Sequence, residues 1–347
     1  MFFIILSTQK IYIKNLIPMN KSQKIELLKV RDISSLLSDT FSFTKANFKS
    51  LFTGLFYICA PILLVYGICS VLFFNSYFNL ILTNITQEIN ENSYVSNDYS
   101  DMFLSIIPNV LFFSLSAFLA MSLVYTVSLC YIKLYKNNEE ISTPILWIQT
   151  KKYFGKVIGS QFILLLATII AYAVCFFPMI MGPIGAIFTV LFFIIFIFGL
   201  FYLYIKLIFA QAFIILEDKG IFESFKLSYK FTQGIFWNIF LFIFLMGLIT
   251  SLFTYIFQLP GTILIYFNIF MGFANQNSSG NSFISLLGSA LTGLGAAIGY
   301  VAYSIYYIGL SIFYYSTIEN RTGIATNTQI ENIGKTEDYD NSSDLKR

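Results

Sequence analysis

The chain has no histidine and few charged residues. Only 11% of its 347 residues are Asp, Glu, Lys or Arg, and arginine occurs only as Arg31, Arg321 and Arg347. A soluble domain carries about 25% charged residues, so this chain cannot present a large soluble surface. The missing histidines exclude His-based acid/base catalysis and remove the usual nitrogen ligand of zinc and haem sites. We therefore expect no cofactor and no metal.

Cysteine is also scarce, and its four positions show no metal-binding pattern. Cys59, Cys69, Cys130 and Cys175 lie inside apolar stretches, and none forms a CxxC pair. This placement is typical of small, buried apolar side chains. The sequence also lacks a phosphate-binding GxxxxGK[ST] loop and a serine nucleophile elbow. It offers no catalytic set, so enzymatic activity is kept only as an alternative.

Apolar and aromatic residues are abundant: 57% of the chain is hydrophobic, with 40 Phe and 23 Tyr. Apolar runs of about 20 residues match the thickness of a bilayer core. They predict an all-α, polytopic membrane protein with six spans, at Leu51–Phe74, Phe103–Tyr131, Val157–Ile180, Gly185–Lys206, Phe236–Phe257 and within Phe283–Tyr315. The apolar stretch 262–274 follows Leu259-Pro260-Gly261 and is shorter than a span, which favours an interfacial or re-entrant piece. The apolarity that persists after Lys206 favours a helix continuing to Leu216.

The six spans divide the chain into three regions. Residues 1–31 form a predicted cytoplasmic N-terminal segment, in which Met19 is the expected translation start. Residues 32–317 form the membrane domain. Residues 318–347 are polar and mildly acidic, and we expect a disordered cytoplasmic tail.

All 21 Lys and Arg residues fall on one side of the predicted spans. They precede span 1, lie between spans 2 and 3 or spans 4 and 5, or follow span 6, and the opposite loops have none. The positive-inside rule therefore predicts that both termini are cytoplasmic. The excess of Lys over Arg, with much Phe, Ile and Asn, is typical of an AT-rich bacterial genome. We accordingly expect a multi-pass protein of the bacterial inner membrane.

A basic, aromatic segment at 220–238 leads into span 5, and similar segments precede two other spans. Residues 33–56 align without gaps over residues 221–244, with matches that include Phe43/Phe231, Thr44/Thr232, Phe48/Phe236, Phe52/Phe240 and Phe56/Phe244. Residues 141–164 share the same character. The pattern predicts three units, each an amphipathic helix at the inner surface followed by a hairpin. Chance matches between Phe-rich segments are the alternative explanation.

One set of residues resembles a known family. The passage with Glu217, Gly220, Ser224, Ser228, Gly234, Phe236 and Trp237, and the start Ile33–Phe41 followed by Asn47-Phe48-Lys49, are similar to the membrane-domain family associated with bacterial glycerophosphodiester phosphodiesterases. The resemblance covers roughly residues 30–318 and implies a six-span bundle. It does not imply phosphodiesterase activity, because that activity belongs to a separate soluble barrel for which this chain has no room.

Several residues within or beside the spans are candidates for packing or function. The pairs Ser289/Gly293 and Gly295/Gly299 predict close helix packing or an oligomer surface. Interhelical hydrogen bonds explain Gln161, Gln211 and Asn238, and a shared polar cavity at the inner ends of their spans is the alternative.

The charged residues nearest the spans also have two interpretations each. Lys206 can extend its ammonium from the end of span 4 to the inner surface, and a buried functional lysine is the less favoured alternative. The acidic pairs Glu139-Glu140 and Glu217-Asp218 favour helix starts over a metal site. Because the net charge is only +3, the lysines near aromatic residues favour anionic lipid over nucleic acid.

These observations favour a non-enzymatic membrane scaffold or accessory protein that interacts with lipid, with a partner protein or with a second copy of itself. One alternative is a transporter or channel for an apolar or lipid-like substrate. The other is a membrane-embedded enzyme that modifies lipid.

Overall fold

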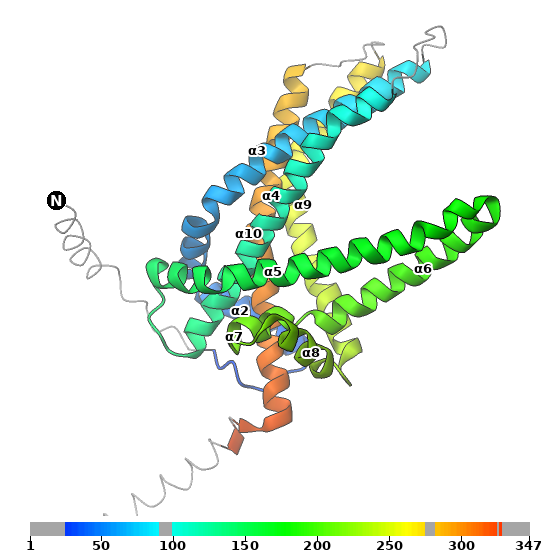
Figure 1. Cartoon of the computed structure of the whole chain (residues 1–347). Helices are drawn as coiled ribbons and strands as arrows, with labels where there is room; N and C mark the ends of the chain where they lie inside the picture. The colour runs from blue at the N-terminus through cyan, green and yellow to red at the C-terminus, as the bar shows by residue number, and fades with distance from the viewer. Residues whose placement is uncertain (1–24, 90–98, 275–281, 325, 328–347) are drawn as a thin grey trace, which may run out of the picture.

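The computed structural model describes residues 25–89, 99–274, 282–324 and 326–327, and every regular element in these ranges is a helix (Figure 1). The elements are α2 (Ile33–Ala46), α3 (Phe48–Ile89), α4 (Tyr99–Lys136), α5 (Thr143–Phe176), the 3-10 helix η2 (Phe177–Met181), α6 (Gly182–Leu207), α7 (Ala210–Leu216), α8 (Ile221–Phe231), α9 (Phe236–Ala274) and α10 (Ser282–Thr322). The predicted all-α class is confirmed.

Six stretches are long and apolar enough to cross a membrane. They are Phe48–Phe78, Ile106–Lys136, Thr143–Ile180, Phe188–Leu216, Phe236–Gly272 and Ser282–Thr322. Each contains or overlaps one predicted span, so the expected multi-pass architecture is confirmed. Five of them lie between the predicted domain boundaries at residues 31 and 317, and the sixth extends past residue 317 to Thr322.

Four of the long helices form the body of the protein, and two stand apart from it. Helices α3, α4, α9 and α10 lie side by side, with α10 in contact with the other three (Figure 1). Helices α5 and α6 form a hairpin that projects away from these four (Figure 1). No residue in the most apolar stretch of Thr143–Ile180 is buried within the protein. The hairpin therefore carries an apolar surface that the rest of the described chain leaves largely uncovered.

Short helices gather around the last part of α10 (Figure 1). We call this end of the long helices the inner end, because the sequence predicts that it faces the cytoplasm. The side chain of Asp32 caps α2 by accepting a hydrogen bond from the amide of Ser35, at 3.1 Å. On both α2 and α8 the buried face is marked by small polar residues. The alignment that pairs Thr44 with Thr232 also pairs Thr40 with Ser228, and all four are buried. Their burial supports the repeat between the first and third units.

The second unit differs from the prediction. No separate amphipathic helix precedes its span, because α5 runs without a break from Thr143 to Phe176. Its amphipathic part is the first third of that helix, in which Leu146, Thr150 and Tyr153 are buried.

Two further expectations about helix ends were wrong. The stretch 262–274 is neither re-entrant nor a separate interfacial piece, because α9 continues through Pro260 to Ala274. A membrane helix tolerates such a proline because neighbouring helices can satisfy the backbone groups that the proline frees. The apolar segment after Lys206 does not continue α6, which ends at Leu207 before α7 begins at Ala210.

The two chain ends are partly described. Helix α10 extends to Thr322, so the first residues of the predicted disordered tail are helical. Residues 328–347 and Met19 lie outside the described residues. Within the N-terminal segment, the amide of Arg31 donates a hydrogen bond to Ser316 Oγ at 2.9 Å. This bond ties the start of the described chain to α10.

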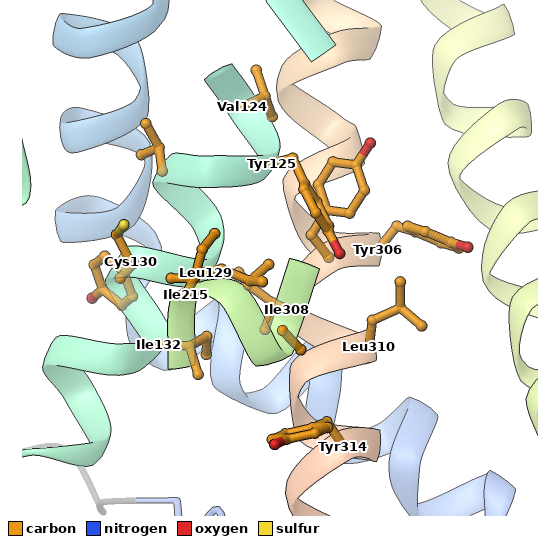
Figure 2. Close-up of a cluster of buried hydrophobic side chains, with 14 of the residues drawn as sticks. Val124, Tyr125, Leu129, Cys130, Ile132, Ile215, Tyr306, Ile308, Leu310 and Tyr314 are labelled. Atoms are coloured by element: carbon orange, nitrogen blue, oxygen red, sulfur yellow. The ribbon is translucent and has the colours of Figure 1, made fainter. Parts of the chain in front are cut away.

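The buried core lies in the inner half of the protein. Figure 2 shows its side chains where α4, α7 and α10 meet, including Tyr125, Ile215 and Tyr314. The core places the inner ends of the helices, and the short helices attached to them, in fixed positions.

Candidate functional site at the inner end

The turn between α7 and α8 fastens three long helices together. Asp218 adopts a left-handed conformation with φ of 58°, which is uncommon for any residue except glycine but tolerated by Asp. Its carboxylate accepts hydrogen bonds from Lys133 on α4 at 2.7 Å and from Lys152 on α5 at 3.2 Å. The hydroxyl of Tyr153 on α5 also donates to it. A single carboxylate thus joins α4 and α5 to the turn.

The electrostatics of this turn keep Asp218 ionised. Partial burial alone would raise the pKa of its carboxyl, but the hydrogen bonds from Lys133, Tyr153 and Lys152 outweigh burial and hold the pKa well below its usual range. Lys133 is equally well satisfied, because its ammonium also donates to the carbonyl of Ile215 at 2.7 Å. We interpret Asp218 and its three donors as a structural group that holds α4 and α5 to the turn.

Glu217, the neighbour of Asp218, binds a different helix. Its carboxylate accepts a hydrogen bond from the hydroxyl of Tyr314 on α10. Neither acidic residue of the turn lies beside Lys206, which contacts Tyr202 and Tyr229 instead. The acidic pair therefore serves to join helices.

The remaining residues of the family-like passage shape the ends of α8 and form contacts among α6, α8 and α9. Gly220 is the N-cap of α8, and Gly234 turns the chain with φ of 80°, a conformation that favours glycine. The buried hydroxyl of Ser228 donates to the carbonyl of Lys206 at 2.9 Å, which docks α8 on the end of α6. Phe236 begins α9 and packs against Tyr202 at 5.6 Å between ring centroids, whereas Trp237 is 73% exposed.

The end of α6 holds a lysine that sequence reasoning placed at the surface. Lys206 is only 6% exposed. Its ammonium lies 5.5 Å from the ring centroid of Tyr202 and 5.2 Å from that of Tyr229, within the range of cation–π attraction. The nearby Tyr202 hydroxyl raises the pKa of the Tyr229 phenol, an effect that Lys206 partly offsets. The side chain is thus buried, whereas the favoured interpretation placed its ammonium at the inner surface; a function for this lysine stays a prediction.

The predicted polar cavity does not form as one group. Gln161 accepts a hydrogen bond from Ser122 on α4, and Gln211 on α7 accepts one from Ser160 at 2.8 Å. These bonds hold α5 to α4 and α7, as the interhelical interpretation expects. Asn238 is exposed at the start of α9 and joins neither pair.

The small residues of α10 pack against other helices of the same chain. A Cβ atom added at Gly295 would lie 2.6 Å from the carbonyl carbon of Phe257 on α9, and one at Gly299 would meet Thr254. A Cβ at Gly293 would meet Ser70 on α3, and Ser289 is fully buried. Within the chain, this stripe is thus used for contacts with α9 and α3.

Exposed lysines and aromatic residues mark the inner start of all three units. We call this set the inner rim; it comprises Lys45, Lys49 and Phe48 in the first unit, Lys151 and Trp147 in the second, and Lys226, Lys230, Phe222 and Trp237 in the third. The Lys151 ammonium lies 4.8 Å from the Trp147 ring centroid. Aromatic side chains with lysines are characteristic of the membrane–water interface.

The sequence did not indicate the partners of Asp218, Glu217 and Lys206. Lys133, Tyr153 and Tyr314 carried no local signal, because each acts across the gap between helices distant in the chain. Tyr202 lies one helical turn before Lys206 and could have been paired with it, but Tyr229 could not. In the described part of the chain no group of three or more His, Cys, Asp or Glu residues is placed to hold a metal ion.

Comparison with known proteins adds no relative: no family model, no curated protein and no solved structure matches the chain.

Proposed function

We propose that the protein is a non-enzymatic scaffold of the bacterial inner membrane, with both termini in the cytoplasm, that gathers anionic phospholipid at its inner surface. The inner rim is the observation that carries this proposal. Its lysines repeat at the start of each unit and are exposed, while Glu217 and Asp218 are engaged in contacts between helices.

The energetics favour lipid as the partner of the rim. A lysine near an anionic leaflet gains about 1 kcal/mol, and several together attract acidic headgroups. Exposed aromatic rings such as Phe222 (74% exposed) and Trp237 supply apolar contacts at the same level. The α5–α6 hairpin adds a large apolar surface suited to acyl chains.

The experiment compares the lipids retained by the purified chain. Wild-type protein in mixed micelles of phosphatidylglycerol and phosphatidylethanolamine should retain more of the anionic lipid by native mass spectrometry. The Lys226→Glu/Lys230→Glu variant should lose at least part of this preference, because two rim charges are reversed. The matched control Lys226→Arg/Lys230→Arg preserves charge and should keep it. An unchanged preference in the Glu variant contradicts the proposal.

The resemblance to the phosphodiesterase-associated membrane domains is consistent with this function. Its residues form the joint of α6, α8 and α9, next to the inner rim. We propose a shared architecture on this basis, with the activity of the associated barrels excluded from the proposal.

A lipid transporter is the second candidate, favoured by the α5–α6 hairpin. Because the hairpin projects from the other four helices, lipid can lie along faces that a compact bundle would bury (Figure 1). A fluorescent-phospholipid scrambling assay in proteoliposomes distinguishes the two. Lipid transfer between leaflets above that of protein-free vesicles supports the transporter, and its absence supports the scaffold.

A further inference from the structure

Lys206 is buried without an anionic partner. It is 6% exposed, and in the described ranges the ion pairs involve Arg31, Lys133, Lys152 and Lys219 but not Lys206. A buried charge is costly unless it is paired. Two tyrosine rings compensate only in part, because their attraction is weaker than that of a carboxylate.

Lys133 provides the contrast within the same protein. Its side chain is 14% exposed, and its ammonium has three acceptors, namely the Tyr153 hydroxyl, the Ile215 carbonyl and the Asp218 carboxylate. Among the described residues, Lys133 thus has several acceptors, whereas the contacts of the Lys206 ammonium are the rings of Tyr202 and Tyr229. Three hydrogen-bond donors of Lys206 remain available to an acceptor from outside.

The Lys206 ammonium is not sealed off from the surroundings. The buried polar atoms without a partner in the described chain are Gln149 Oε1, Ser289 Oγ and Ser304 Oγ, and the Lys206 Nζ atom is not one of them. The two tyrosines that contact it are partly exposed to the surroundings, Tyr202 by 42% and Tyr229 by 41%. Both tyrosines that contact the ammonium therefore reach the protein surface.

The position of Lys206 indicates what kind of acceptor arrives there. Tyr202 packs on Phe236, which precedes the exposed Trp237 of the inner rim, and Lys226 lies one turn before Tyr229 on α8. Tyrosine and tryptophan at this level belong to the headgroup region of a bilayer. The most abundant acceptor there is a phosphate oxygen.

We propose that Lys206, Tyr202 and Tyr229 form a binding site for one phosphate group. The Lys206 ammonium donates to the phosphate oxygens, and the two phenol hydroxyls border the group. The phosphate belongs to a membrane phospholipid or to a dissolved phosphate ester, and its lipid source rests on the proposed function. Because the site recognises phosphate, it takes zwitterionic and anionic phospholipids alike, unlike the inner rim.

Native mass spectrometry of the full chain in detergent tests the site, with phosphatidylethanolamine, phosphatidylglycerol and glycerol phosphate as separate probes. Wild-type protein should retain one phospholipid more tightly than the rest. Lys206→Met should weaken its binding about tenfold to a hundredfold, the loss of one charge-assisted hydrogen bond. Lys206→Arg should restore binding in part. The matched control Lys29→Met, an exposed lysine outside the inner rim, should retain the tight lipid.

Three outcomes decide the proposal. Loss of the tight lipid in Lys206→Met and not in Lys29→Met supports it with a lipid source. The same pattern with glycerol phosphate alone supports it with a dissolved source. Equal retention of every probe by wild type and Lys206→Met overturns it. If Lys206→Met is not monodisperse, Tyr229→Leu, which removes one of the two rings, replaces it under the same criteria. Failure here leaves the headgroup preference measured with Lys226→Glu/Lys230→Glu unaffected.

Discussion

The contact between α9 and α10 allows a sharp test of the packing. At Gly261 on α9, an added Cβ atom would lie 2.5 Å from the carbonyl oxygen of Gly288 and still closer to the amide nitrogen of Thr292. Cβ atoms essentially never approach other atoms within 3.0 Å, so the shortfall against Gly288 is 0.5 Å. Both obstacles are backbone atoms of α10, which cannot rotate away as a side chain can.

Gly261→Ala should therefore destabilise the protein. Overpacking costs about 1–3 kcal/mol, and the backbone obstacles favour the upper end. Alanine offsets this by its better helix propensity, which is worth up to about 1 kcal/mol. We expect a net loss of roughly 2 kcal/mol in the free energy of unfolding.

Gly247→Ala is the matched control in the same helix. No atom lies within 4 Å of a Cβ added at Gly247, so this variant should be neutral or stabilised by up to about 1 kcal/mol. Reversible unfolding of both variants in mixed micelles, followed by circular dichroism, measures the difference. If Gly261→Ala is as stable as Gly247→Ala, the close approach of α9 and α10 is refuted.

Two other predictions concern the inner turn and the topology. Asp218→Asn should lower the free energy of unfolding by about 1–2 kcal/mol at pH 7, a value limited by the 49% exposure of the Asp218 side chain. Because the pKa of Asp218 is lowered on folding, this contribution to stability is complete well above the ordinary pKa of 3.8 and fades as the pH falls below it. The free energies of unfolding of wild type and variant should therefore converge in acid. A difference between them that does not vary with pH argues against the ion pairs. In a cysteine-free background, Ile330→Cys should react with a membrane-impermeant maleimide only from the cytoplasmic side, and labelling from outside would contradict the proposed orientation.

The membrane spans were predictable because they depend on composition. Runs of apolar residues and one-sided lysines are properties of the sequence, and all six expected spans are present. Their ends were less predictable. Leu259-Pro260-Gly261 stops a helix in water, but inside a membrane α9 continues through it, with Gly261 held closely against Thr292 of α10.

The candidate site was predictable only where its residues are neighbours in sequence. The turn at Glu217–Gly220 was identified from its residue types, but its role was not, because Asp218 acts on Lys133 and Tyr153, which are remote in the chain. The burial of Lys206 depends likewise on Tyr229, which α8 brings back over the end of α6. Pairings of this kind come from tertiary packing and leave no mark in local periodicity.

The central position of α10 has a consequence for biogenesis. Among the described helices it is synthesised last, yet it supplies partners to earlier segments, as Ser316 does for the amide of Arg31 and Tyr314 for Glu217. The helices synthesised earlier therefore lack their contacts with α10 until α10 has been made. Synthesis of α10 is the step that completes the contacts among the described helices.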